Sequence, residues 1–530
     1  MSSRRCYRSK RALRCRANRF ARAIALALLL SAVTAFSGCA KSGSAGEPGT
    51  LNFLIEAMPT NLDPRIGTDA QSEEIDGLIF DGLVQRDAQM NVVPDLAQSW
   101  ETPDPLTYIF HLRQGVKFHD GRPFTSADVK YTLDSIMSGK VQTPKSGAFE
   151  LVQSVDTPDA YTVVIHLRQP YASFIFNLSR LAIGIVPNGS GAGLAQDPIG
   201  TGPFKFVSMT TDEQVVLERN PNYFGKIPNV SRLRMRVVPE AVVRALELRK
   251  GTADIGGVDS LSPDMIVSLA KEPGIVVDEQ PGTQLAYIGF NFNDPILSHR
   301  EVRQALAYAT DRESLIRYLL RGMARPASSL LPPSNWAYDP NVKKYSYDPG
   351  EANRLLDAAG FRRGPGGVRF HITLKTSTEE SARVLGEALA NQWSRVGVVL
   401  DLRSLEPGTF YADISRGSFQ LYTLRWTGYT NDDPDIFDYV YNSKRMPPLG
   451  ANRGHYVNPA LDSLLNQQRV EMDHDKRKQL IWKIQEIVAE DEPYIDLWYL
   501  DNTCVHRARV TNVHLSPGGD YNFLDQVELK

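Results

Sequence analysis

Cysteine is scarce in this sequence of 530 residues, which contains four cysteines in all. Cys6 and Cys15 fall in an N-terminal leader that we expect to be removed, and Cys39 lies where that leader ends. Only Cys504 would remain as a free thiol, so no disulfide can form within the mature chain. The sequence therefore excludes a scaffold held together by disulfides.

Motifs of catalysis and phosphate binding are also missing. The sequence has no G-x-S-x-G, no H-E-x-x-H, no C-x-x-C and no G-x-x-x-x-G-K-[ST]. Its nine histidines are scattered, with no pair four residues apart, so we expect no metal site. Gly200 and Gly202 begin like a dinucleotide loop, but Pro203 and the alternating apolar residues after it favour a turn into a strand. We expect neither enzymatic activity nor a cofactor.

A surplus of negative charge appears once the leader is set aside. The whole chain has 59 Lys and Arg against 61 Asp and Glu, a formal net charge of −2. Nine basic residues and no acidic one lie in residues 1–22, which leaves 50 basic against 61 acidic residues, or −11. A body of this sign is a poor partner for nucleic acid. With 42% hydrophobic and 23% charged residues, it has the composition of a soluble globular protein.

The N-terminus has the features of a bacterial export signal. The basic stretch is followed by an apolar run that ends at Phe36 and is too short to span a membrane comfortably. The closing letters Phe-Ser-Gly-Cys resemble the bacterial lipobox, whose first position is usually Leu. We predict a lipoprotein signal over residues 1–38, lipidation of Cys39 and a flexible tether over 39–49. The alternative is an ordinary cleaved signal with an incidental cysteine.

Hydrophobic periodicity predicts a mixed α/β body. Residues 370–402 alternate, then follow a helical spacing up to Gly397, then alternate again, which is a β-α-β unit. A second unit is expected over 233–255, with Val242, Ala245 and Leu246 as the apolar positions of its helix. No low-complexity linker interrupts the body, so its domains must be joined by short crossings. We therefore expect two hinged lobes with a ligand cleft between them.

Other local signals mark element boundaries. Ser298 and Glu301 form a predicted capping box, and Asp348 is a predicted N-cap. Two amphipathic strands are expected over 106–112 and 161–167, with their histidines solvated or hydrogen-bonded rather than bound to a metal.

The densest polar stretch follows an apolar strand-like segment over 419–424. It reads Arg-Trp-Thr-Gly-Tyr-Thr-Asn-Asp-Asp-Pro-Asp over residues 425–435. An aromatic face and three carboxylates within four residues offer stacking and acceptors for a cationic group such as an ammonium. A calcium loop is a rival, but the Gly and the bidentate Glu of an EF-hand are missing. A surface turn with solvated acids is the other alternative.

Several blocks in fixed order carry a resemblance to a known family. They are the lipobox, Leu62–Pro64, Pro94–Trp100, Phe110–Val129, Pro198–Phe204, Arg219–Phe224, Val302–Asp311 and Tyr347–Phe361. Together they resemble family 5 of the extracytoplasmic solute-binding proteins, the peptide- and nickel-binding components of ABC importers. The resemblance runs from about residue 50 to the end of the chain.

The resemblance implies an α/β fold like that of the type II periplasmic binding proteins, with two hinged lobes and an inserted domain. Its ranges would be 50–82, 198–280 and 498–530 for domain I, 83–197 for domain II and 281–497 for domain III. A ligand would be held between domains I and III. The closed protein, a monomer, would then dock on a permease that works with an ATPase.

The resemblance also draws attention to the loop after Trp426. Peptide-binding relatives have Trp, two small residues and an Asp that pairs with the α-ammonium of the peptide. Tyr429 replaces that Asp here, and a phenol cannot supply the ion pair. The candidate ligand-binding residues are Trp426, Thr427, Gly428, Tyr429, Asp432 and Asp433, with Thr68 and Asp69 from the facing lobe.

We therefore expect a lipid-anchored binding protein in the periplasm or at the cell surface that delivers di- to oligopeptides to an ABC importer. A sugar, an opine-like compound or a nickel complex is the alternative ligand, although no histidine lies in the loop. A sensory or chaperone-like binding protein is a second alternative. A hydrolase is a third, for which no nucleophile motif exists.

Overall fold

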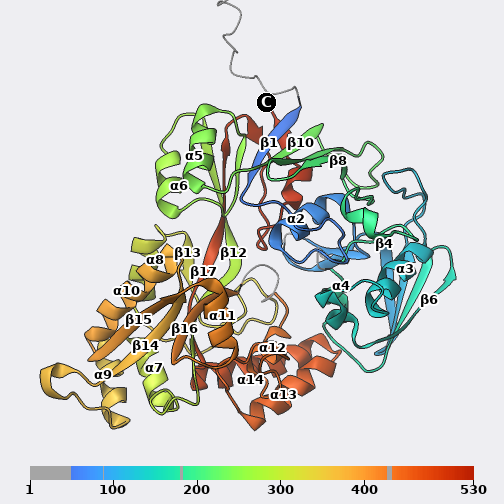
Figure 1. The fold of residues 1–530 in the computed structure, drawn as a ribbon. Helices are drawn as coiled ribbons and strands as arrows, with labels where there is room; N and C mark the ends of the chain where they lie inside the picture. The colour runs from blue at the N-terminus through green and yellow to red at the C-terminus, as the bar shows by residue number, and fades with distance from the viewer. Residues whose placement is uncertain (1–48, 88, 180–182, 427–431) are drawn as a thin grey trace, which may run out of the picture. The chain divides into compact units, whose positions relative to one another are not determined.

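Two long antiparallel strands, β12 (Ile275–Phe290) and β17 (Tyr494–Arg507), form the centre of the largest sheet (Figure 1). The computed structural model describes residues 49–87, 89–179, 183–426 and 432–530. In this part of the chain the sheet has eleven strands, and its order is β15-β14-β16-β12-β17-β11-β1-β10-β9-β8, with β13 also paired to β17.

One end of β12 and β17 belongs to a first lobe. Residues 275–281 of β12 pair with 501–507 of β17. The neighbouring strands here are β11 (Ile255–Val258), β1 (Thr50–Ile55), β10 (Arg232–Val237), β9 (Gln214–Arg219) and β8 (Phe204–Thr210). The helices of this lobe are α2 (Ala70–Ile79), α5 (Ala241–Lys250) and α6 (Pro263–Leu269), and a small ribbon joins β18 (Val510–Thr511) to β19 (Glu528–Leu529).

The other end of the two strands belongs to a second lobe. Residues 285–289 of β12 pair with 494–499 of β17, and the register shifts between the two paired stretches. The other strands here are β16 (Leu421–Trp426), β14 (Phe370–Ser377), β15 (Val398–Leu405) and β13 (Ala324–Pro326). The helices are α7 (Arg300–Tyr308), α8 (Arg312–Leu319), α9 (Pro349–Ala358), α10 (Glu380–Ser394), α11 (Pro407–Ser415), α12 (Ile436–Tyr441), α13 (Pro459–Val470) and α14 (His474–Asp491). The interruption at 282–284 marks where the two lobes meet.

An inserted module, which lies between α2 and β8 in the sequence, has a sheet of its own. Its sheet has the order β4-β5-β7-β6, and a two-stranded ribbon lies before it. The elements are β2 (Val84–Arg86), β3 (Val92–Pro94), β4 (Ala97–Asp104), β5 (Thr107–Leu112), α3 (Ser126–Met137), β6 (Val152–Asp159), β7 (Thr162–Leu167) and α4 (Phe174–Leu178).

The hydrophobic cores follow these groups of elements. One core draws only on residues 83–185, apart from partly buried neighbours at its edge. A second gathers residues from β1, α2, β9, β10 and the segment 504–527, and two more lie within 285–499. The three domain ranges remain a prediction. The separation of the hydrophobic cores supports that prediction. Cys504, on β17, is a free and fully buried thiol of the first lobe.

The predicted β-α-β unit at 370–402 is confirmed as β14, α10 and β15. The two strands pair in parallel. Gly397, which was predicted to end the helical segment, has a φ of +83°, a left-handed conformation that glycine adopts without a steric cost. In the second unit, β10, α5 and β11 are also present. Its predicted helix face is wrong in part, because Ala245 is buried whereas Val242 and Leu246 are exposed.

Two predicted helix starts had different outcomes. Asp348 caps α9 as expected, with its carboxylate accepting the N–H of Glu351 at 2.9 Å. The capping box at Ser298 is wrong: α7 begins at Arg300 with His299 as the N-cap, and the Ser298 hydroxyl donates instead to the carbonyl of Pro295. Within the described ranges, no helix has the length and apolar content to cross a membrane.

Candidate functional site

Trp426 is the last residue of β16, at the point where the strand leaves the central sheet. Residues alternate across a strand, so Tyr422, Leu424 and Trp426 share the face that packs on one core of the second lobe. The indole stacks on Tyr287 of β12, with ring centroids 5.8 Å apart and planes 11° apart. The predicted aromatic residue is thus held in a rigid stack.

Arg453 lies beside this stack, a residue that the sequence analysis did not single out. Its guanidinium carbon is 5.6 Å from the centroid of the Trp426 ring. Burial lowers the pKa of Arg453, but the neighbouring phenols of Tyr287, Tyr422 and Tyr494 outweigh it and raise the pKa overall. The Trp426 Nε1 atom and one Arg453 Nη atom are buried and have no hydrogen-bond partner among the residues that the structure describes. No motif marks Arg453, so only the fold could have revealed it.

Three of the predicted ligand residues, Thr427, Gly428 and Tyr429, lie outside the described residues. Their roles therefore stay predictions. The described chain continues from Asp432, four residues before the first residue of the short helix α12.

The acidic residues after this gap are buried and paired. Asp432 is 3% exposed and Asp433 is 6% exposed, so the alternative of a surface turn with solvated acids is wrong. Asp432 forms an ion pair with Arg86 at 3.0 Å. Asp433 accepts from the Ser173 hydroxyl at 2.7 Å and lies 3.5 Å from Arg477. Contact of either carboxylate with a ligand stays a prediction, whereas their contacts with protein groups are present in the structure.

Metal binding finds no support at these acids. Across the described ranges, no group of three or more His, Cys, Asp or Glu side chains is placed to hold a metal ion. The calcium alternative concerns a stretch that includes residues 427–431, which lie outside the described residues.

The two candidates from the first lobe lie at the start of α2. Asp69 is the N-cap of this helix and accepts from the N–H and the hydroxyl of Ser72 at 3.0 and 2.6 Å. Burial alone would raise its pKa, but the hydrogen bonds from Ser72 and Thr60 lower it overall. Thr68 is exposed, and its contact with a ligand stays a prediction. The Asp69 carboxylate thus caps a helix, a role that the sequence pattern Asp-x-x-Ser could have indicated.

Asp259 is a further residue of interest in the first lobe, just after β11. Its backbone is left-handed, with a φ of +50°, and its carboxylate accepts the N–H of Thr503 at 2.6 Å. Desolvation raises the pKa of Asp259 to about 6, and Arg425 of β16 is among the charges that oppose this rise. The charge of Arg425, the residue before Trp426, therefore acts on an acid of the first lobe.

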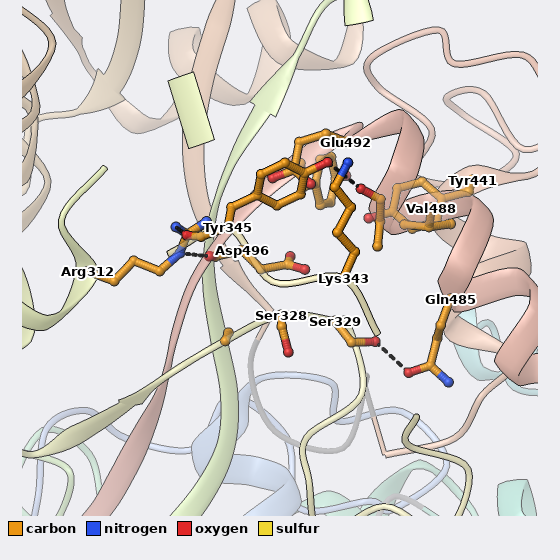
Figure 2. Close-up of a pocket in the computed structure, with 13 residues that line it drawn as sticks. Arg312, Ser328, Ser329, Lys343, Tyr345, Tyr441, Gln485, Val488, Glu492 and Asp496 are labelled. Atoms are coloured by element: carbon orange, nitrogen blue, oxygen red, sulfur yellow. Dashed lines mark hydrogen bonds between the residues drawn. The ribbon is translucent and has the colours of Figure 1, made fainter. Parts of the chain in front are cut away.

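A small cavity of about 20 Å³ lies within the second lobe, between α14, the start of β17 and the segment 327–345 (Figure 2). Figure 2 shows Arg312, Lys343, Glu492 and Asp496 around it. Desolvation raises the pKa of Asp496 to about 7, against the opposing charge of Arg312. A space of this size suits water and not a peptide, and no residue predicted from the sequence lines it. It is therefore a feature of the lobe rather than the ligand site.

The fold and this site define a class of protein. Two α/β lobes joined by a shared pair of long strands, with an inserted module, are the architecture of the type II periplasmic binding proteins. The profile described as bacterial extracellular solute-binding proteins, family 5 middle, matches residues 91–448. The chain therefore belongs to family 5 of the bacterial extracellular solute-binding proteins.

Individual relatives support the same conclusion. The chain is 27% identical to the dipeptide-binding protein of Escherichia coli over 503 residues, which covers 89% of this chain and 94% of the relative. Among solved structures, NikA from Brucella suis in complex with Fe(III)-EDTA has a TM-score of 0.83 and 25% identity, covering 91% of this chain and all of that one. DppA from Helicobacter pylori in complex with the peptide STSA has a TM-score of 0.73 and 27% identity, covering 91% and 98%.

Proposed function

We propose that this protein is the peptide-binding component of an ABC importer. The observation that carries the proposal is the position of Trp426, at a strand end of the second lobe, where its indole stacks on Tyr287 and follows the exposed Arg425. Relatives of the same family include a dipeptide-binding protein and a structure that holds a peptide. The protein works by binding, and its role requires no covalent chemistry.

The proposed mode of capture combines an aromatic surface with polar contacts. Trp426 is fixed by its stack on Tyr287, so it offers a surface whose orientation is set before the ligand arrives. Thr427, Gly428 and Tyr429 are proposed to contact the ligand, and Thr68 to meet it from the first lobe. The predicted domains, 50–82 with 198–280 and 498–530, then 83–197, and 281–497, are proposed as the moving parts. The permease and its ATPase are the proposed partners.

We propose that Cys39 carries the lipid that holds the protein at the membrane. The support is the sequence Phe-Ser-Gly-Cys at the end of the apolar run and the small-residue tether that follows. An anchored receptor stays close to its permease, which raises its effective concentration there.

A thermal-shift titration of residues 49–530 against pooled di-, tri- and longer peptides tests the proposal. A ligand at a hundred times its Kd stabilises the folded state by about 2.7 kcal/mol. With an unfolding entropy of about 2 cal/mol/K per residue, this corresponds to a rise in Tm of about 2–3 °C. A rise with peptides supports the proposal. No rise with any pool, under conditions where another solute gives one, overturns the peptide assignment.

A non-peptide solute is the second candidate, and one observation favours it. Tyr429 stands where peptide-binding relatives have the Asp that pairs with the α-ammonium. The same family fold holds a metal chelate in NikA from Brucella suis. The titration therefore includes Ni(II) with histidine and a pool of sugars as parallel arms, and a shift confined to one of these arms identifies the ligand class.

A further inference from the structure

The three acids Asp432, Asp433 and Asp435 all bond to residues of the inserted module. We call this group the clamp. It consists of Arg86, Tyr171 and Ser173 from the module and Asp432, Asp433 and Asp435 from the second lobe. The sequence separation between the two sides exceeds 250 residues in every pair, so the contacts exist only because of the fold.

The first contact of the clamp is the ion pair of Arg86 and Asp432. The two side chains are 7% and 1% exposed, and the N···O distance is 3.0 Å. The guanidinium is further oriented within the module. It lies 4.0 Å from the centroid of the Phe176 ring and donates to the Ser179 hydroxyl at 3.1 Å. A guanidinium held on several sides presents its charge to Asp432 in one fixed direction.

The second contact centres on Ser173, which is 1% exposed. Its hydroxyl donates to Asp433 at 2.7 Å and accepts from Arg477 of α14 at 2.7 Å. The same Asp433 oxygen accepts the N–H of Asp435 at 2.7 Å, which fixes the turn that leads into α12. One serine of the module thus joins both a carboxylate and a guanidinium of the second lobe.

The third contact is made by Tyr171 and the backbone beside it. The phenol donates to Asp435 at 2.9 Å, and Arg469 of α13 pairs with the same carboxylate at 3.3 Å. The N–H of Ala172 donates to the carbonyl of Arg469 at 2.8 Å. Burial raises the pKa of Asp435, with Arg469 as the largest opposing charge.

A buried network of this kind tolerates little displacement. Charges removed from water are stable only while their partners stay in good geometry. The chain is therefore fixed at Asp432 to Asp435, only six residues after Trp426. Trp426 itself is held by its stack on Tyr287.

We propose that the inserted module positions the ligand site through the clamp. Arg86, Tyr171 and Ser173 are positioning residues: they touch no ligand, yet ligand affinity depends on them because they fix Asp432, Asp433 and Asp435, which follow Trp426 by six to nine residues in the sequence. The part of this proposal that concerns affinity rests on the proposed function. The part that concerns the clamp does not.

Hydrogen–deuterium exchange of the ligand-free protein tests the clamp directly. The variants are Arg86→Met, Ser173→Ala and Tyr171→Phe. Matched controls in the same module are Arg122→Met, which removes an exposed pair with Asp120, and Tyr161→Phe. We expect faster exchange in peptides covering 421–426 and 432–441 for the clamp variants alone. Unchanged exchange in both peptides overturns the clamp, and a change confined to 432–441 overturns its positioning role.

Affinity for the tightest-binding peptide of the pool gives the second readout. Arg86→Met is expected to raise Kd about five- to thirtyfold, the factor that corresponds to about 1–2 kcal/mol, and Arg86→Lys to recover part of this loss. Ser173→Ala is the milder variant and keeps the test usable if Arg86→Met folds poorly. An unchanged Kd in all clamp variants, with faster exchange, reduces the clamp to a purely structural contact and overturns the proposal.

The two proposals fail in different ways. If the unaltered protein binds no peptide, the proposed function fails while the exchange experiment still decides the clamp. If it binds peptide and the clamp variants behave like the controls in both readouts, the clamp proposal fails and the proposed function stands.

Discussion

The ring of Tyr287 lies parallel to the indole of Trp426 on one side and to the phenol of Tyr494 on the other, with centroid distances of 5.8 and 4.2 Å. Strands β16, β12 and β17 each supply one ring of this stack. The stack therefore connects Trp426, at the proposed ligand site, to the two strands that run through both lobes.

Replacement of Trp426 is expected to destabilise the second lobe. Removing a buried Trp side chain costs about 3–5 kcal/mol, so Trp426→Ala should lower the calorimetric Tm by several degrees. Trp426→Phe keeps part of the stack and should lose much less. Trp482→Phe, at a half-buried tryptophan of α14, is the control. Equal Tm values for Trp426→Ala and the unaltered protein would contradict a structural role for the stack.

The junction at Gly282 leaves no room for a side chain. A Cβ atom there would lie 2.4 Å from the carbonyl oxygen of Leu500 and 2.5 Å from the Asn502 side chain. Overpacking of this kind costs about 1–3 kcal/mol, so Gly282→Ala should lower Tm by about 1–3 °C. It should also alter how much the radius of gyration changes when a ligand binds, as measured by X-ray scattering. Gly408→Ala, where a Cβ meets nothing within 4 Å, is the matched control.

The cavity acid Asp496 predicts a pH dependence of stability. Its folded-state pKa is raised from 3.8 to about 7 by desolvation, so its contribution to stability is fully present below about pH 4 and is lost as pH rises through 7. Asp496→Asn removes this loss. The variant should gain about 1–3 °C in Tm over the unaltered protein on going from pH 5 to pH 8. A pH-independent difference, or the same trend in the exposed Asp197→Asn, would refute the assignment.

The lipid anchor is tested by fractionation of cells that express the full chain. Cys39→Ala should move the protein from the membrane fraction to the soluble fraction, because a single residue carries the proposed anchor. Ser37→Ala, two residues earlier, leaves the cysteine intact and is the control. Retention of the Cys39→Ala protein on the membrane would remove the anchor from the proposal.

Much of the fold could be predicted because its signals are local. The alternation at 370–374, the helical spacing at 385–396 and the N-cap at Asp348 each depend on neighbours within a few residues. The predictions were wrong where contacts between distant parts of the chain decide which residues are buried. Val242 and Leu246 are apolar and spaced for a helix face, yet α5 buries Arg244 and Ala245 on its packed side. The Arg244 guanidinium bonds to the carbonyls of Val238 and Pro239 and to Glu56, contacts that the sequence pattern does not reveal.

The candidate site was accessible to sequence reasoning only in part. Trp426 stood out as a large aromatic residue at a strand end, and the acids after it as an unusual cluster. Their partners did not, because Arg86 and Ser173 lie hundreds of residues away and are unremarkable in their own surroundings. Asp259 likewise becomes notable only through its left-handed backbone and the charge of Arg425.

Cys504 gives the protein a built-in reporter. In residues 49–530 it is the sole thiol, it is fully buried on β17, and burial raises its pKa well above the ordinary value. A maleimide dye should therefore leave the native protein unmarked and react as the first lobe unfolds. For the same reason, a cysteine introduced on each lobe can be labelled without background. The distance between such labels would follow the approach of the lobes in real time.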